Sequence, residues 1–235
     1  MSQPLVAVAG AGGYVGNALC QAFEESPVFE VVRVTRENYA AMQGRNYDFL
    51  INCAMPSKRF WAKNNPAADF EETVRKTAEL VYGWKYGKFI QISTVSARCE
   101  LETVYGRHKA AAEKICESGE NLIVRLTAMY DEALSKGALV DILNHRKVFV
   151  SGKSRYAFTP LSFAGQWIAG HLEEKGVVEV GAKNTVSLEE ISETLGEKIE
   201  FEGPVESQAI LNSRPEFPDA RDVFQFLNKM KGARS

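Results

Sequence analysis

Short apolar runs recur along the first half of the chain, and stretches with helical spacing separate several of them. Continuous apolar runs of this kind are typical of strands that are covered on both faces. The predicted strands span residues 5–9, 31–34, 49–51, 88–92 and 121–126, and the predicted helices span residues 13–25, 66–86 and 105–118. Parallel strands need long crossovers, so this alternation predicts a parallel sheet with helices on both faces.

The pattern changes after Leu126. We predict strands at 148–150 and 177–180 and helices at 161–173, 187–195 and 220–230, the second of these helices opened by the capping residue Ser187. We interpret this half as an extension of the sheet with a small lobe over its carboxyl edge. No internal repeat or clear linker separates the two halves.

Composition and charge narrow the class of protein. With 45% apolar and 25% charged residues the chain can bury a sizeable core. A net charge of −2, from 28 basic and 30 acidic residues, argues against binding nucleic acid through bulk charge. We see no signal peptide in residues 1–4 and no apolar run near the roughly 20 residues of a membrane span. We therefore expect a cytoplasmic protein that binds neither nucleic acid nor membrane.

The cysteines and histidines show no spacing typical of a metal site. The four cysteines contain no CxxC pair, and the three histidines are scattered along the chain. We therefore expect neither a structural zinc site nor a disulfide framework, and reduced thiols fit a cytosolic location. These residues are Cys20, Cys53, Cys99, Cys116, His108, His145 and His171.

A glycine-rich loop follows the first predicted strand and opens the first predicted helix. Gly10 permits a tight turn, Gly13 lets the backbone approach a phosphate, and Gly16 lets the helix pack closely on the strand. Free backbone N–H groups at the positive end of a helix bind anions. The loop, with Tyr14 and Val15, therefore predicts a site for the pyrophosphate of a dinucleotide cofactor.

The residues after the second strand bear on which dinucleotide binds. An arginine at this position can pair with a 2′-phosphate and select NADP, whereas a carboxylate can bind both ribose hydroxyls and select NAD. Arg36 favours NADP, and Glu37 keeps the NAD interpretation open.

A third signal combines a helix and the strand before it. Tyr105 and Lys109 are four residues apart, so they share one face of a predicted helix. The charge of the lysine can stabilise a tyrosinate and favour proton exchange with a hydroxyl or carbonyl. Ser93 and Thr94 end the preceding strand and offer hydroxyls that can bind the reacting oxygen.

This ordered set of motifs resembles the extended short-chain dehydrogenase/reductase family, which contains nucleotide-sugar epimerases, dehydratases and reductases. The resemblance runs from about Pro4 to Leu195. It implies a Rossmann-like doubly wound parallel sheet with a small C-terminal substrate-binding lobe, divided into a dinucleotide-binding core at 1–126 and the extension and lobe at 127–235. The residues that carry it are Gly10, Gly13 and Gly16, the strand 48–54, Ile92-Ser93-Thr94, Tyr105, Lys109 and the strand 124–126.

The resemblance also assigns roles to residues. It implies that Thr94, Tyr105 and Lys109 are catalytic and that the strand end at Asn52 and Ala54 lies beside the cofactor. Arg155 lies where sugar-nucleotide members grip the diphosphate of the substrate. The helices at 66–86 and 105–118 correspond to those that often form a dimer interface in this family, so we expect a homodimer.

Two features depart from the family pattern. The interval from Thr94 to Tyr105 is shorter than usual, and this loop normally shapes the sugar pocket. Val95 and Ser96 stand where 4,6-dehydratases carry an Asp-Glu pair, so no acid is placed to protonate a leaving hydroxyl, which disfavours dehydration.

His108 and the residues 58–61 each have a structural interpretation as well as a functional one. His108 lies between Tyr105 and Lys109 in the sequence but about 100° from its neighbour on the helix, so we expect a surface residue. Residues 58–61 follow the third strand and either touch a substrate or form a surface loop with one anchoring aromatic residue.

The leading hypothesis is an NAD(P)-dependent sugar-nucleotide epimerase or reductase in which Tyr105 exchanges the proton of a sugar hydroxyl. One alternative is a reductase of a non-sugar carbonyl on the same fold. The other is a non-catalytic regulator that senses NADP, which would have no need of Thr94, Tyr105 and Lys109 together.

Overall fold

The computed structural model of the chain describes residues 3–232, and it divides into two compact units. The first unit contains Met1–Arg125 and Ser162–Val178, and the second contains Leu126–Leu161 and Glu179–Ser235. The chain first changes unit after Arg125, and the segment Ser162–Val178 then returns to the first unit.

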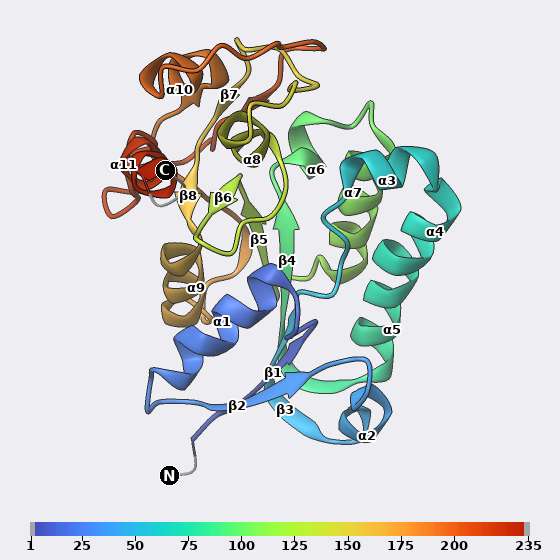
Figure 1. Ribbon diagram of the computed structural model, residues 1–235. Helices are drawn as coiled ribbons and strands as arrows, with labels where there is room; N and C mark the ends of the chain where they lie inside the picture. Colours follow the sequence, from blue (N-terminus) through green and yellow to red (C-terminus); the bar gives the residue numbers. More distant parts are fainter. Residues whose placement is uncertain (1–2, 233–235) are drawn as a thin grey trace. The chain divides into compact units, whose positions relative to one another are not determined.

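The first unit is built on a six-stranded sheet in the order β2-β1-β3-β4-β5-β9 (Figure 1). The pairings of β1 with β2 and β3, and of β3 with β4, are parallel. The strands are β1 (Leu5–Ala9), β2 (Glu30–Val34), β3 (Asn46–Asn52), β4 (Lys85–Thr94), β5 (Leu122–Leu126) and β9 (Gly176–Val180). The chain turns from β1 to β2 on one side and then crosses to β3 on the other, so a switch point lies at the carboxyl end of β1.

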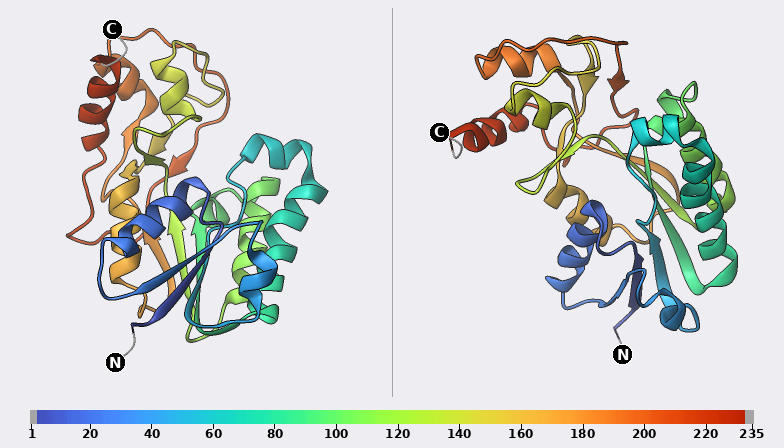
Figure 2. Two further views of the ribbon diagram at one scale, coloured as in Figure 1. Left: turned by 60° about the horizontal axis from the view of Figure 1, so that its bottom comes forward. Right: turned by 45° about the vertical axis from the view of Figure 1, so that its right-hand side comes forward.

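Helices cover both faces of this sheet (Figures 1 and 2). One face carries α1 and α9, which approach closely because Gly165 has no side chain against the Ala18 carbonyl. The other face carries α5 and α7 over a core that includes Leu50, Phe89 and Ile123. The helices of the unit are α1 (Tyr14–Glu24), α2 (Tyr39–Gln43), α3 (Arg59–Asn64), α4 (Pro66–Phe70), the π-helix η1 (Glu71–Arg75), α5 (Lys76–Gly83), α6 (Ser96–Cys99), α7 (Val104–Cys116) and α9 (Leu161–Gly170).

The predicted helix at 66–86 was too long. The helical stretch ends at Gly83, and Tyr86 belongs to β4, where it pairs with Tyr47 of β3. Trp84 is buried against the rings of Tyr39 and Tyr47. Its apolar side chain continued the helical pattern in the sequence, although it belongs to the core beside the sheet. The predicted helix at 161–173 likewise ends earlier, at Gly170.

The second unit holds two small sheets, in the orders β10-β7-β11 and β6-β8. Its core includes Tyr156, Phe158, Leu188 and Ile191. Its elements are β6 (Met129–Tyr130), α8 (Ala138–Leu143), β7 (Arg155–Tyr156), β8 (Thr159–Pro160), β10 (Val186–Ser187), α10 (Leu188–Thr194), β11 (Ser207–Gln208) and α11 (Asp222–Gly232). The predicted capping serine is confirmed, because Ser187 and Glu190 form a reciprocal capping box at the start of α10.

The predicted strand at 148–150 was wrong. Val148 alone forms a bridge, to Phe201, and the chain then bends. Phe149 is 74% exposed, so the apolar run was not a sign of burial here.

None of the helices in residues 3–232 combines the length and the apolar character that crossing a membrane requires.

Candidate active site

The glycine loop lies at the switch point of the sheet. Gly10 adopts a φ of +82°, and its amide donates to the Val34 carbonyl at 3.0 Å, which ties the end of β1 to the end of β2. A Cβ on Gly10 would lie 2.7 Å from the backbone of Ala54, and a Cβ on Gly16 would overlap the Gly10 carbonyl. The predicted roles of Gly10 and Gly16 in the turn and in close packing therefore have a steric basis.

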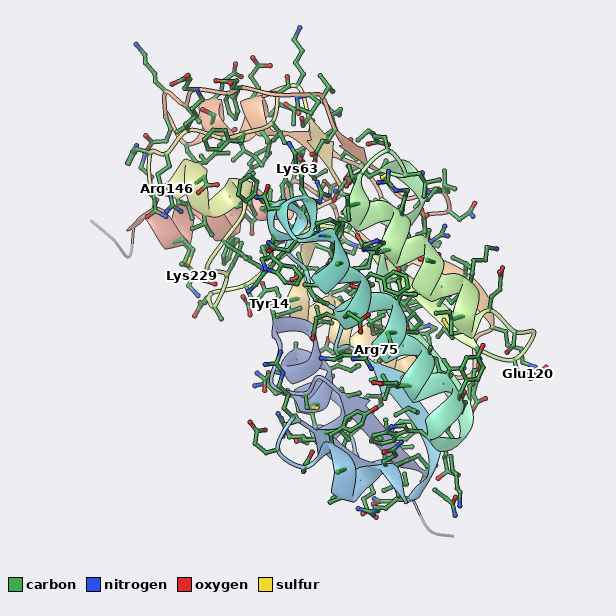
Figure 3. The ribbon with its side chains drawn as sticks, turned by 90° about the vertical axis from the view of Figure 1, so that its right-hand side faces the viewer. Tyr14, Lys63, Arg75, Glu120, Arg146 and Lys229 are labelled. Atoms are coloured by element: carbon green, nitrogen blue, oxygen red, sulfur yellow. The ribbon has the colours of Figure 1, made fainter. Side chains whose placement is uncertain are left out.

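The start of α1 fits the pyrophosphate of a dinucleotide. Gly13 precedes the helix without a side-chain cap, and Gly12 and Gly13 are both exposed. The helix begins at Tyr14, which is labelled in Figure 3. Tyr14 and Val15 are both half-buried. An uncapped, exposed helix end offers backbone N–H groups and a positive partial charge to an anion.

The turn after β3 forms the other side of this loop. The Asn52 side chain is buried, its amide donates to Thr77 Oγ1 and Gln91 Oε1 at 3.1 Å each, and its oxygen accepts from the Ala54 amide at 3.0 Å. Asn52 therefore shapes the turn that brings Ala54 against Gly10. Ala54 itself is exposed.

Arg36 lies just beyond the carboxyl end of β2, on the strand next to β1. Its side chain and that of Glu37 are both exposed. Asn38 forms the turn here, because its oxygen accepts from the Thr35 amide at 2.8 Å and its nitrogen donates to the Arg33 carbonyl at 2.9 Å. A side-chain hydrogen bond with Thr35 holds the pKa of Glu37 below its usual value.

The structure brings Thr94, Tyr105 and Lys109 together. Thr94 ends β4, and the other two lie on α7, where the Lys109 ammonium lies 5.2 Å from the centre of the Tyr105 ring. Thr103 caps α7 by accepting from the Gly106 amide at 2.9 Å. Gly106 lets the start of α7 pack against the loop before it, since a Cβ there would overlap the Glu100 carbonyl.

Burial changes the acidity of both α7 residues. Burial raises the pKa of Tyr105 to about 12, while the Arg59 guanidinium and a side-chain hydrogen bond with Thr94 act to lower it. Burial lowers the pKa of Lys109 to about 7, and Asp69 and Glu113 oppose this. Arg59 is therefore a cation that favours the tyrosinate. The predicted effect of Lys109 on Tyr105 stays a prediction.

The Arg59 side chain, which comes from α3, is held by two residues of the segment between Thr94 and Tyr105. It donates to Ser96 Oγ at 3.2 Å and pairs with Glu100 Oε1 at 2.8 Å. Thr94 Oγ1 in turn donates to Ser96 Oγ at 3.3 Å. The segment at 58–61, one interpretation of which was a surface loop, therefore contains the start of helix α3, which places Arg59 beside the tyrosine.

His108 is not the surface residue that we predicted. Its ring is half-buried, and Nδ1 lies 2.7 Å from Oδ2 of Asp69, a residue with no exposed surface. The Phe70 ring contacts the imidazole edge to face. The 100° step between neighbouring helical residues predicted that His108 and Lys109 point in different directions. It did not predict that α4 packs against α7 and covers His108.

Glu113 forms a buried polar network one turn beyond Lys109. It accepts from Ser93 Oγ at 2.5 Å and pairs with the Arg125 guanidinium through both carboxylate oxygens, the shortest contact being 2.7 Å. Ser93 therefore supports this network from β4, while Thr94 is the hydroxyl next to Tyr105.

Arg155 lies in the second unit, on β7. Its guanidinium donates to the Thr185 carbonyl at 2.8 Å and to Thr185 Oγ1 at 3.0 Å, and it lies 3.3 Å from the Glu190 carboxylate. Its predicted contact with a substrate diphosphate stays a prediction.

Sequence reasoning missed Asp69 and Glu100 as parts of this site, and it named Arg59 only within the segment 58–61, not as a partner of Tyr105. One usable signal was the spacing of Asp69, Thr73 and Thr77, which are four residues apart and form a polar stripe on one helical face. Arg59 and Glu100 carry no such signal, because they come from different segments and meet only in the folded chain.

The fold and the site define an NAD(P)-dependent oxidoreductase of the short-chain dehydrogenase/reductase type. The model of the NAD dependent epimerase/dehydratase family matches residues 6–130, more than half of the chain. The chain belongs to this family. No curated protein sequence gives a significant match.

Solved structures of sugar-nucleotide enzymes share the fold over nearly the whole chain. A dTDP-4-dehydrorhamnose reductase from Clostridium acetobutylicum is 13% identical, with 97% of this chain and 99% of that chain covered and a TM-score of 0.76. The RMD structure from Pseudomonas aeruginosa, complexed with NADPH, is 14% identical, with 99% and 100% covered and a TM-score of 0.75. A UDP-glucose 4-epimerase from Thermotoga maritima, with UDP-glucose, is 16% identical, with 98% and 100% covered and a TM-score of 0.72. At these identities the likeness establishes the fold.

Proposed function

We propose that this protein is an NAD(P)-dependent epimerase or reductase of nucleotide sugars, with Tyr105 as the acid and base. The observation that carries the proposal is the meeting of Thr94, Tyr105 and Lys109 at the same edge of the sheet as the glycine loop. The carboxyl ends of parallel strands lie at one edge, so β1 and β4 bring the glycine loop and Thr94 to the same edge. Helix α7 places Tyr105 and Lys109 there, since Tyr105 forms a hydrogen bond with Thr94.

The side chains of the site have separate roles in this reaction. The Tyr105 hydroxyl exchanges a proton with the reacting sugar oxygen, and the Thr94 hydroxyl binds the same oxygen. Lys109 contributes a positive charge at Nζ, and Arg59 favours the tyrosinate electrostatically. Burial of Tyr105 and Lys109 keeps water from these groups and strengthens the electrostatic interactions between them.

A nicotinamide dinucleotide bound at the glycine loop supplies hydride transfer to or from the sugar carbon. We assign its binding to Gly10, Gly13, Tyr14, Val15, Gly16, Asn52, Ala54 and Lys109. The exposed guanidinium of Arg36 at the end of β2 supports NADP over NAD, because it can pair with a 2′-phosphate.

A nucleotide sugar is the substrate class that the similar structures support. Their names describe a dTDP-sugar reductase and an epimerase with UDP-glucose. For this chain we assign Arg155 to the diphosphate of such a substrate. We also propose a homodimer, as the family resemblance implies.

The test is turnover by the Tyr105→Phe variant. The protein is incubated with NADPH or NADH and a panel of nucleotide sugars, while the absorbance of the reduced cofactor and the stereochemistry of the product are followed. We expect kcat to fall by about 10²–10⁴-fold, because a positioned acid and base contributes about this much. Cofactor binding is expected to persist, because the glycine loop is unchanged.

Tyr82→Phe is the matched control, because Tyr82 is 77% exposed on α5 and loses the same hydroxyl without touching the site. Its kcat is expected to equal that of the wild type. Unchanged turnover in Tyr105→Phe would overturn the assignment of Tyr105.

A further inference from the structure

A stripe of polar side chains is buried along the helices α4, η1 and α5. Asp69, Thr73 and Thr77 succeed one another at intervals of four residues, and all three have no exposed surface. Among the residues that the structure describes, Asp69 Oδ1 and Thr73 Oγ1 have no hydrogen-bond partner. Burying a polar atom without a hydrogen-bond partner costs free energy, so each of these atoms calls for an explanation. We look for it in the groups that surround the stripe.

The stripe adjoins α7, which packs against α4, η1 and α5 and carries Lys109. Lys109 is 3% exposed, and water therefore does little to stabilise its ammonium. Two carboxylates act on its charge, Asp69 from α4 and Glu113 from α7 itself.

Glu113 is already neutralised by another cation. Both of its oxygens contact the Arg125 guanidinium, and Ser93 donates a further hydrogen bond. The positive charge of Arg125 offsets part of the field of this carboxylate at Lys109. Glu113 is therefore the weaker counter-charge, and its effect on the pKa of Lys109 is smaller than that of Asp69.

The other charges near α7 are also paired. Arg59 of α3 pairs with Glu100 beside Tyr105, and Lys76 pairs with Glu72 on the η1 and α5 helices. Arg75 pairs with both Glu71 and Glu79 on the outer side of these helices, where Figure 3 labels it. Each of these charges is therefore balanced by an opposite charge on a neighbouring side chain.

Asp69 differs from all of them. One oxygen lies 2.7 Å from His108 Nδ1, and the other is buried without a partner in the described part of the chain. We propose that Asp69, held in place by His108, is the counter-charge that keeps Lys109 protonated in its buried position. In this arrangement Asp69 and His108 are positioning residues, and they act on the reaction through Lys109.

The electrostatic effects agree with this geometry. Burial lowers the pKa of Lys109 to about 7, and Asp69 is the larger of the two groups that raise it. Removing the charge of Asp69 therefore leaves Lys109 with a lower pKa and less positive charge at neutral pH. The value of this charge for turnover rests on the proposed function, but the titration of Lys109 does not.

The test is the titration of Lys109 in the free enzyme, followed by carbon NMR with labelled lysine side chains. The signal of Lys109 is the one that disappears in Lys109→Met. In Asp69→Asn, which keeps the shape of the side chain, we expect the midpoint to fall by about one pH unit or more. In Asp69→Glu, which keeps the charge, we expect it to stay nearer the wild-type value.

Glu117→Gln is the matched control for loss of a carboxylate. Glu117 is exposed at the end of α7 and pairs with Lys114, so we expect the Lys109 midpoint to remain unchanged. Should Asp69→Asn fail to fold, Asp69→Ser removes the same charge with a smaller side chain, and the same fall is expected.

A Lys109 midpoint that stays at the wild-type value in a folded, neutral Asp69 variant overturns the inference. That outcome leaves the proposed function intact, because Tyr105→Phe tests it separately by turnover. Conversely, unchanged turnover in Tyr105→Phe would overturn the proposed function. A shifted Lys109 midpoint in Asp69→Asn would still support the role of Asp69. With a nucleotide sugar that the wild type turns over, Asp69→Asn is expected to lose kcat at a lower pH than the wild type.

Discussion

Tyr105 and Lys109 of α7 show that burial changes the acidity of residues whose pairing their spacing in the sequence predicts. Four-residue spacing indicated that they share a helical face, and they do. Burial then raises the pKa of one and lowers the pKa of the other, so each favours its neutral form. The largest charges that oppose these shifts are Arg59 for Tyr105 and Asp69 for Lys109, and both lie on other helices.

The lowered pKa of Lys109 has a consequence for stability. The folded protein releases this proton near pH 7, whereas an unfolded chain holds it until about pH 10.4. Between these values the unfolded state binds more protons, so the free energy of unfolding increases as the pH rises, by about 1.4 kcal/mol per pH unit. Tyr105 has the opposite effect only above about pH 10, where its proton leaves the unfolded chain first.

We therefore expect the wild type to gain stability relative to Lys109→Met between pH 6 and pH 9. Denaturant unfolding at both values measures the difference, and groups common to the two proteins cancel. A difference that is the same at both pH values would contradict the buried, depressed titration of Lys109.

The junction of β1 and α1 depends on the absence of side chains at Gly10 and Gly16. A Cβ on Gly16 would overlap the carbonyl oxygen of Gly10, which belongs to the backbone and cannot rotate away. Gly12 lies in the same loop, but a Cβ there would meet no atom within 4 Å. Comparing substitutions at Gly16 and Gly12 therefore distinguishes a steric requirement for glycine from a requirement for backbone flexibility.

Gly16→Ala is expected to lower the free energy of unfolding by about 1–3 kcal/mol and to weaken NADPH binding, because the backbone of the loop must move. The helix propensity of alanine offsets only part of this, at most about 1 kcal/mol. Gly12→Ala is the control, with a change in stability within about 0.5 kcal/mol. Denaturant unfolding of both variants measures these effects, and equal stabilities would refute the steric argument.

The exposed aromatic side chains on α4 and α5 bear on the oligomeric state of the protein. Phe70 on α4 and Tyr82 on α5 are 45% and 77% exposed. Aromatic side chains are enriched at interfaces between proteins, so they support the proposed homodimer through these helices.

Sedimentation of the purified protein is expected to give twice the chain mass of 26.1 kDa. Tyr82→Glu places a charge in the proposed interface and is expected to shift the equilibrium toward the monomer. Val28→Glu, at a site that is 55% exposed in the loop between α1 and β2, is the control and should sediment as the wild type. A wild type that sediments as a monomer would argue against the dimer.

Local patterns in the sequence were enough to predict the parallel sheet, the glycine loop, the Tyr105 and Lys109 pair and the capping serine of α10. Each of these depends on neighbouring residues or on a period of a few residues, which the sequence displays directly. The errors at residues 84–86 and 148–150 arose where apolar side chains served a core or remained exposed outside the expected element.

The environment of the catalytic pair could not be derived in this way. Arg59 and Asp69 are far from Tyr105 and Lys109 in the sequence, and they act on them only because α3 and α4 pack against α7. Glu100, at the end of α6, acts on Tyr105 because α6 also packs against α7. Electrostatic effects depend on distance and on exposure to water, and both are properties of the folded chain. The sequence alone supplied Tyr105 and Lys109 as candidates for the chemistry, and packing in three dimensions set the surroundings that shift their pKa values.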